Sequence, residues 1–394
     1  MAISILQTPA SASLAQSPII FSVTETNTAL LQNDDFQYIG ELYYWTGSLS
    51  QSGSLPDYTM QKFPNIALSG IFDLNRIINS TLTDLAQVNQ SNVMYFAVDF
   101  YYQYLSGSTY ITGSHVKTPV YKALDGYGLF QEAIGQPIQN KTPFWPLMTD
   151  GPATQSVFTT NVGTMGAWCG QPALASSGFV ADNVYYEGSN TQTAIYYLSG
   201  STSSSQQIDR FPIGPSEPDF PLSLSTGEWF TITPRIGNSS PFGLKLRFNV
   251  ICNQKYPNIR IKWKNRYGQF DWFNFNMVNR QSFNTERRTY QPQLGSWQSS
   301  TLGYNNYDSS VLNYIADSKQ AISVNTDWVD DDYNEIFKQL LVSDEVYWIY
   351  NEATGDLRPI TINTSSITFK TGVVDKVIQY SFDFNWGQAY KLII

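Results

Sequence analysis

The chain has 394 residues, of which 42% are hydrophobic, 15% aromatic and only 14% charged, and its formal net charge is −9. This aromatic content with so little charge argues against an intrinsically disordered protein. No apolar run approaches the ~20 residues of a membrane-spanning helix, so we expect no membrane insertion, and the negative charge argues against general attraction to nucleic acid. Because the length exceeds one typical domain of ~100–200 residues, we expect several domains.

The N-terminal segment is small and polar. Residues 1–18 are rich in Ala, Ser and Gln and contain Pro9 and Pro18, which predicts an arm or a loosely held strand. The segment lacks the basic start and the long apolar stretch of a secretory signal. We therefore expect the protein to fold in a reducing cytoplasm.

Strand and helix patterns follow from about residue 18 onward. A strand is predicted over 36–45, where alternation places four apolar side chains near one face: Phe36, Tyr38, Leu42 and Tyr44. Apolar residues at helical spacing over 72–85 predict a short helix. The aromatic run 93–105 and the run 109–112 predict a hairpin.

The clearest strand patterns lie in the C-terminal third. The segment 259–264 alternates, with its basic side chains on one face, and a turn at 265–268 leads to a returning strand at 270–275. The acidic run 330–332 precedes an apolar run and suits a helix N-terminus, where the macrodipole favours negative charge. The final strand places five apolar residues on one face: Ile378, Tyr380, Phe382, Phe384 and Trp386.

These patterns predict a mainly β, multi-domain protein with β-sandwich or β-barrel-like architecture and a few short helices. We divide it into the arm over 1–18, a β-rich domain with one helix over 19–146, a Gly/Ser/Pro-rich β insertion over 147–227, and a β-rich domain over 228–394 with a helix near 328–342. No internal repeat with a fixed period is visible.

The residue types limit the possible chemistry. His115 is the only histidine, which removes His-containing triads and multi-His metal sites, and we expect it on the surface or in a capping role. Cys169 and Cys252 lie far apart and form no ligand pair, so we expect buried or inert thiols. We therefore predict no catalytic, metal or cofactor site. Carboxylate pairs, as in glycosidases, stay open, because no motif selects one pair among the 32 acids.

Charge is unevenly distributed. The segment 245–288 holds ten basic residues and only Asp271 and Glu286 as acids, so it carries +8 and leaves −17 for the rest of the chain. This asymmetry suits a nucleic-acid surface, a face that docks onto an acidic neighbouring subunit, or a solvated outer strand face. We favour subunit docking over nucleic-acid binding, with these interface candidates: Lys262, Trp263, Lys264, Arg266, Trp272, Arg287 and Arg288.

Several segments carry a family resemblance. They are 17–21, 38–44, 63–65 with 70–74, 263–275 and 335–343. In that order they resemble tail and neck virion proteins of tailed bacteriophages that infect Bacteroidota, including crAss-like phages. The resemblance covers roughly 17–80, 229–290 and 327–390.

The resemblance implies a structural role in the virion. The protein is expected to be a non-enzymatic subunit of a symmetric ring, six- or twelve-fold, in the tail hub, tube or collar, made in the host cytoplasm. Its expected partners are other copies and other tail or neck proteins, with DNA passing transiently through a lumen. The alternative is a receptor- or glycan-binding adhesin at the tail periphery, whose exposed Trp and Tyr would stack on sugars. A weaker alternative is a glycan-degrading virion enzyme.

Overall fold

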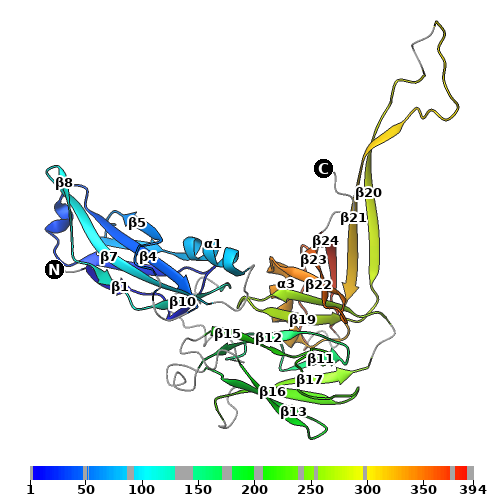
Figure 1. The fold of residues 1–394 in the computed structure, drawn as a ribbon, viewed down its shortest axis with the longest axis horizontal. Helices are drawn as coiled ribbons and strands as arrows, with labels where there is room; N and C mark the ends of the chain where they lie inside the picture. The colour runs from blue at the N-terminus through cyan, green and yellow to red at the C-terminus, as the bar shows by residue number, and fades with distance from the viewer. Residues whose placement is uncertain are drawn as a thin grey trace. The chain divides into compact units, whose positions relative to one another are not determined.

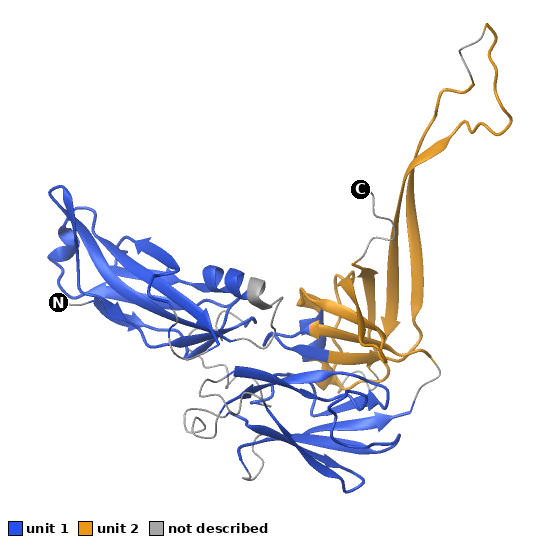
Figure 2. Cartoon of the chain, in the orientation of Figure 1, with its two compact units in different colours: residues 1–252, 264–271, 335–340 blue, residues 253–263, 272–334, 341–394 orange. Residues whose placement is uncertain are grey.

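The structure is a computed structural model. It describes residues 3–47, 51, 53–86, 93–128, 145–170, 180–198, 207–237, 244–252, 256–295, 300–372 and 378–387. The chain forms two compact units, each built from separate chain segments (Figure 2). Unit 1 contains residues 1–252, 264–271 and 335–340, and unit 2 contains residues 253–263, 272–334 and 341–394. Strands dominate both units, which confirms the predicted mainly β class (Figure 1).

The N-terminal part of unit 1 contains two sheets and one helix. The three-stranded sheet has the order β1-β3-β6, with bounds Ile3–Gln7, Ile20–Glu25 and Ser69–Asp73. The second sheet has the order β2-β10-β7-β4-β5, and β8 and β9 also pair with β7. Its strands are β2 (Ala12–Leu14), β4 (Gln37–Thr46), β5 (Tyr58–Lys62), β7 (Met94–Ser106), β8 (Thr109–Thr112), β9 (Val116–Lys117) and β10 (Tyr121–Leu124). A 3-10 turn covers Leu30–Gln32, and helix α1 covers Asn75–Ala86.

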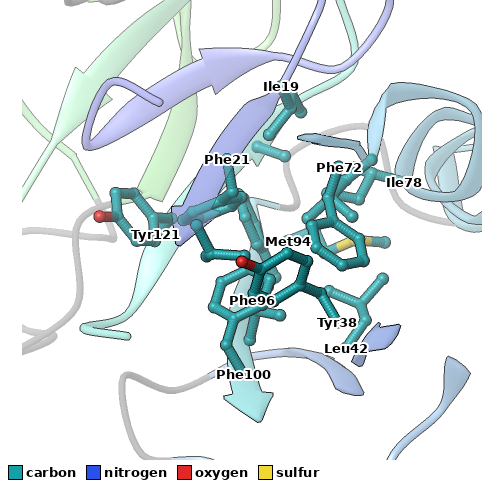
Figure 3. Packing of buried hydrophobic residues seen from close by; sticks show 14 of the residues in the cluster. Ile19, Phe21, Tyr38, Leu42, Phe72, Ile78, Met94, Phe96, Phe100 and Tyr121 are labelled. Atoms are coloured by element: carbon teal, nitrogen blue, oxygen red, sulfur yellow. The ribbon is translucent and has the colours of Figure 1, made fainter. Parts of the chain in front are cut away.

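One aromatic core joins these sheets and α1 (Figure 3). Phe100 packs against Phe21 and Phe72, with ring centroids 5.5 and 5.3 Å apart, and all three rings are fully buried. Leu74 and Ile78 bring the apolar side of α1 into the same core. Burying a large apolar side chain stabilises a fold by roughly 1.5–3 kcal/mol, so this cluster is a major source of stability.

Local patterns in this region predicted the pairing correctly. The hairpin of β7 and β8 forms with Leu105 opposite Tyr110. Phe36, Tyr38 and Leu42 belong to the core, and Tyr44 packs against it. The helix begins at Asn75, two residues after Asp73, whose Oδ1 accepts hydrogen bonds from the Ile19 and Asn75 amides at 3.1 Å.

Residues 1–18 are not a free arm. Strand β1 pairs antiparallel with β3, and β2 pairs parallel with β10. Ile3 and Leu14 are 4% and 3% exposed, so both are anchored in hydrophobic cores. The small Ala and Ser residues hid this pattern, because they fit between sheets without a strong hydrophobic signal.

The remainder of unit 1 contains two further sheets. The five-stranded sheet has the order β11-β17-β16-β13-β14, with bounds Thr154–Phe158, Leu246–Ile251, Trp229–Arg235, Asn183–Gly188 and Thr193–Tyr197. The two-stranded sheet pairs β12 (Thr164–Cys169) with β15 (Gln207–Pro212).

The predicted boundary between 227 and 228 is therefore wrong. Thr154 lies opposite Arg247, and Tyr186 lies opposite Ile232, in continuous strand ladders across that boundary. Stacked aromatic rings reinforce them, since the centroids of Phe230 and Phe248 are 5.0 Å apart. Residues 147–227 are thus not a separate insertion.

A seven-stranded sheet makes up most of unit 2. Its order is β19-β18-β22-β23-β24-β21-β20. The strands are β18 (Ile259–Lys264), β19 (Phe270–Phe275), β20 (Arg280–Tyr290), β21 (Leu312–Asn325), β22 (Val346–Asn351), β23 (Asp356–Ile362) and β24 (Ser381–Trp386). A 3-10 turn at Asp331–Tyr333 leads into helix α3, Asn334–Val342.

The predicted hairpin of β18 and β19 is confirmed, and its turn requires glycine. Gly268 has a φ of +74°, and a Cβ there would lie 1.8 Å from the Asp125 carbonyl oxygen. Phe382 and Phe384 in β24 are fully buried, and Ile378 and Tyr380, which precede this strand, are almost so, as the predicted one-sided pattern requires. Trp386 is half-buried.

Candidate interaction interface

The most exposed element of unit 2 is a long β ribbon. Strands β20 and β21 pair antiparallel from Arg280 opposite Ser323 to Tyr290 opposite Leu312. Strand β24 pairs with β21 only from Ala321 to Asn325. Beyond that point β21 has only β20 as a strand partner among the described residues, and the ribbon runs out from its sheet (Figures 1 and 2). We call the described residues 280–295 and 300–325 the arm.

The arm exposes large apolar side chains to solvent. Tyr304 and Tyr307 near its tip are 73% and 84% exposed. The exposed set is Phe283, Tyr290, Leu294, Leu302, Tyr304, Tyr307, Val311, Leu312 and Tyr314. Aromatic residues gathered on an exposed surface mark sites of interaction, whereas single exposed apolar residues do not. The arm is therefore the best candidate interface of the described chain.

Local chemistry explains why the arm stays extended. Tyr290 and Tyr314 contact each other across the ribbon, with ring centroids 6.1 Å apart in an edge-to-face arrangement, and such cross-strand pairs contribute roughly 0.2–1 kcal/mol. A two-stranded ribbon without a hydrophobic face is marginally stable in water. The part of the ribbon that extends beyond β24 therefore adds little to the stability of a single chain.

Strand β20 is also the edge strand of its sheet. An edge strand presents one row of backbone donors and acceptors, and charged side chains commonly keep it from pairing indiscriminately. Arg287 and Arg288, both predicted interface residues, lie exposed on this strand. Their exposed position would let them select a partner by charge. Their role in an interface remains a prediction.

Two other basic candidates, Lys264 and Arg266, are held in ion pairs of low exposure. Lys264 is 7% exposed and its Nζ lies 2.7 Å from Asp125 Oδ2. Arg266 Nε lies 2.6 Å from Asp150 Oδ2, in a pair whose side chains are 17% and 6% exposed. Arg260 is 2% exposed and donates to Asn274 Oδ1 at 2.9 Å. Buried contacts thus remove Arg260 and Lys264 from any exposed basic face over 245–288, whereas Lys245, Arg247, Arg280, Arg287 and Arg288 are exposed.

The tryptophan candidates pack inside unit 2. Trp263 is fully buried, and Trp272 is half-buried. Lys262 Nζ lies 5.4 Å from the Trp272 ring and 5.3 Å from the Tyr347 ring, which is cation–π geometry. These three residues support β18, β19 and β22 from within one unit. Trp263 is thus a packing residue, whereas Lys262 and Trp272 are partly exposed and their interface role stays a prediction.

Sequence reasoning missed a buried polar cluster in unit 1. Asp150 accepts hydrogen bonds from Tyr267 Oη at 2.8 Å and from Gln339 Nε2 at 2.6 Å, in addition to its pair with Arg266. Burial raises the pKa of Asp150 despite these partners. The four residues hold 264–271 and 335–340 to the loop that follows Met148. Their only local signal was the turn at 265–268, since Asp150 and Gln339 lie far away in sequence.

A second buried carboxyl group lies beside this cluster. Asp271 Oδ1 accepts a hydrogen bond from Thr149 Oγ1 at 2.7 Å. Burial raises the pKa of Asp271 to about 7, and the nearby Asp150 charge acts in the same direction. Two carboxyl groups with raised pKa values are a familiar catalytic pattern. Here both carboxyl groups accept hydrogen bonds from buried side chains of unit 1, so the arrangement is typical of a structural cluster that holds its segments together.

The remaining candidates give no sign of a reactive centre. His115 Nδ1 lies 3.0 Å from Asp99 Oδ2 on the surface. Cys169 is buried and Cys252 is exposed, so of the expected buried or inert thiols only Cys169 is buried. Within the described ranges, no three His, Cys, Asp or Glu side chains converge as metal ligands, and none of the described helices has the length and apolar character to cross a membrane.

Comparisons with known proteins give little guidance. No family model matches the chain, and no curated protein matches it. Among solved structures, dimeric latent PorU from Porphyromonas gingivalis aligns with 10% identity and a TM-score of 0.19. That alignment covers 82% of this chain and 32% of the PorU chain, so this chain spans about a third of PorU. A similarity this low carries no argument about function.

Proposed function

We propose that the protein is a structural virion subunit, a component of a symmetric ring in the tail hub, tube or collar of a bacteriophage. The arm is the observation that carries this proposal. It extends a strand pair beyond its own sheet and exposes nine large apolar side chains, a cost that a partner molecule would offset. The resemblance of residues 17–80, 229–290 and 327–390 to tail and neck proteins supplies the biological context.

The distribution of charge supports the same role. Subunits that are covered on several sides need apolar and aromatic interface cores, which lowers the charged fraction of the chain. The exposed Arg287 and Arg288 on β20 can pair with acidic groups of a neighbour. An acidic surface facing a lumen would let DNA pass, because like charges repel.

Solution mass tests the proposal directly. Light scattering of the purified chain at micromolar concentration, with negative-stain images of the same sample, should show closed rings, six- or twelve-fold. A protein that remains monomeric at every accessible concentration would contradict self-assembly.

The second candidate is a receptor- or glycan-binding protein at the tail periphery. One observation favours it: a hollow of about 590 Å³ near the arm tip, lined by residues that include Gln293, Tyr304, Asn305 and Asp308. An aromatic ring beside amide and carboxylate groups suits a sugar, which offers both a flat apolar face and hydroxyl groups. A trimer that binds glycans and loses binding on Tyr304→Ala would favour this role over the ring.

A further inference from the structure

Three aromatic side chains of unit 2 surround one arginine. The Cζ atom of Arg358 lies 3.3 Å from the centroid of the Tyr350 ring and 4.7 Å from that of a Trp386 ring. Trp348 packs edge to face against both of these residues, with ring centroids 5.4 Å from Tyr350 and 5.6 Å from Trp386. We call Trp348, Tyr350, Arg358 and Trp386 the arginine box.

Strand pairing brings these side chains together on neighbouring strands, β22, β23 and β24 (Figure 1). Trp348 lies directly opposite Arg358, and Trp386 lies opposite Ile360, two residues after Arg358. Because side chains alternate along a strand, these residues share one face of the sheet. Trp348 is 7% exposed and Tyr350 is 53% exposed. The box therefore begins in the core and opens to solvent.

The arginine is held in place but has no polar partner. Among the described residues the Arg358 guanidinium makes no hydrogen bond and no ion pair, in contrast to Arg266, which pairs with Asp150. Trp386 Nε1 is buried and also lacks an acceptor within the described chain, which is uncommon for a buried donor. A guanidinium fixed by ring contacts presents its N–H groups in a rigid fork, and this order in advance favours binding.

The surrounding charges restrict the ligand. A guanidinium fork binds a carboxylate through two parallel hydrogen bonds. Residues 346–362 contain one base, Arg358, and two acids, Glu352 and Asp356, a net charge of −1. Asp356 is exposed, and its Oδ2 accepts a hydrogen bond from Thr354 Oγ1 at 2.7 Å rather than pairing with Arg358. A partner with many acids would be repelled here, whereas a ligand with one carboxylate and several hydroxyl donors suits both signs of charge.

We propose that the arginine box binds an acidic sugar. Arg358 holds the sugar carboxylate, Asp356 accepts hydrogen bonds from sugar hydroxyl groups, and the exposed Tyr350 ring packs against the apolar side of the sugar. The inference goes beyond the proposed ring function, which needs no ligand. The box also shares no residue with the hollow near the arm tip.

Matched ligands on the unmodified chain test the proposal. The probes are trigalacturonic acid, its methyl ester and a tetra-aspartate peptide, measured by calorimetry. The ester keeps the shape of the sugar but loses its charge. It should bind at least about tenfold more weakly than the acid, because the charge-assisted pair with Arg358 is lost. The peptide should also bind more weakly than the sugar acid.

Variants assign the binding to the box. Arg358→Lys keeps the charge but loses the fork, so it should weaken binding of trigalacturonic acid at least about tenfold. Arg247→Lys is the matched control. Arg247 contacts one ring, that of Trp229, at 4.5 Å, but it donates to Asn249 Oδ1 at 3.0 Å. The control should leave sugar binding unchanged, and thermal unfolding verifies that both variants fold.

Several outcomes would overturn the proposal. Equal binding of the acid and its ester, or binding that Arg358→Lys leaves unchanged, would show that the fork holds no carboxylate. Tighter binding of the peptide would assign the box to a protein partner instead. Loss of sugar binding on Tyr304→Ala would place the ligand at the arm tip.

Ring assembly is a separate readout. Light scattering of Arg358→Lys should match that of the unmodified chain, so a chain that forms no ring can still bind the sugar. If Arg358→Lys abolishes assembly, the box is a contact between subunits, and its assignment as a sugar site fails while the ring function stands.

Discussion

The N-terminal core and the arm are both rich in aromatic residues, but the core buries them and the arm exposes them. Phe21, Phe72 and Phe100 are fully buried, and Phe100 packs in a tilted arrangement against each of the other two rings, whereas Tyr304 and Tyr307 are largely exposed. An aromatic-rich composition therefore does not by itself say whether the aromatic residues stabilise one chain or join several. A hydrophobic core forms between two packed layers of secondary structure, whereas the ribbon of the arm is a single layer. This difference explains why the same residue types are buried in one region and exposed in the other.

Removing the arm should produce the largest effect. Asn284 and Lys319 lie opposite each other, so residues 285–318 can be replaced by Asn-Gly, which forms a tight two-residue turn. We expect complete loss of self-association in light scattering, with little change in the thermal unfolding midpoint. If ring assembly survives this truncation, the arm is not the interface.

Matched aromatic substitutions sharpen the comparison. Phe100→Ala should lower the free energy of unfolding by about 3–5 kcal/mol, because it leaves a cavity in the core. Tyr307→Ala should change it by less than about 0.5 kcal/mol, as expected for an exposed site, yet weaken association. Urea unfolding and light scattering of both variants separate the two effects. Equal destabilisation by both substitutions would remove the distinction between core and arm.

The buried carboxyl group predicts a pH dependence. The folded-state pKa of Asp271 is raised to about 7, above its ordinary value of 3.8, so the folded state holds the proton more tightly than the unfolded state. The stability that this proton supplies is fully present below about pH 4 and decreases as the pH rises to about 7. Asp271→Asn should reduce that decrease, by on the order of 2–4 kcal/mol at most. Urea unfolding at several pH values measures it, and an unchanged slope would contradict the assignment.

The smallest predicted effect concerns charge on the arm. Arg287→Glu with Arg288→Glu should weaken association about tenfold at low salt and less at high salt, because salt screens exposed charges. Lys338→Glu is a suitable control, since its exposed partner Glu335 lies on the same helix. Association that is insensitive to both salt and the arm substitutions would mean that charge does not select the partner.

Local patterns were sufficient for elements that bury one face. The alternation of β24 and the glycine turn at Gly268 could be read directly from sequence, because each depends on neighbouring residues. The ribbon could not, since both faces of β20 are exposed and its residues show no hydrophobic alternation. The burial of Lys264 in an ion pair could not be predicted either, because its partner Asp125 lies more than a hundred residues away in the sequence.

The interleaved segments of the two units have a consequence for synthesis. The arm leaves the ribosome before β24, the strand that joins β21 to the rest of its sheet. Until β24 is made, the ribbon has no anchor on that side, and unit 1 is itself completed only by residues 335–340, which follow the arm in the chain. A chain released early should therefore lack a firmly mounted arm, and order of synthesis would act as a checkpoint that keeps incomplete subunits out of an assembly.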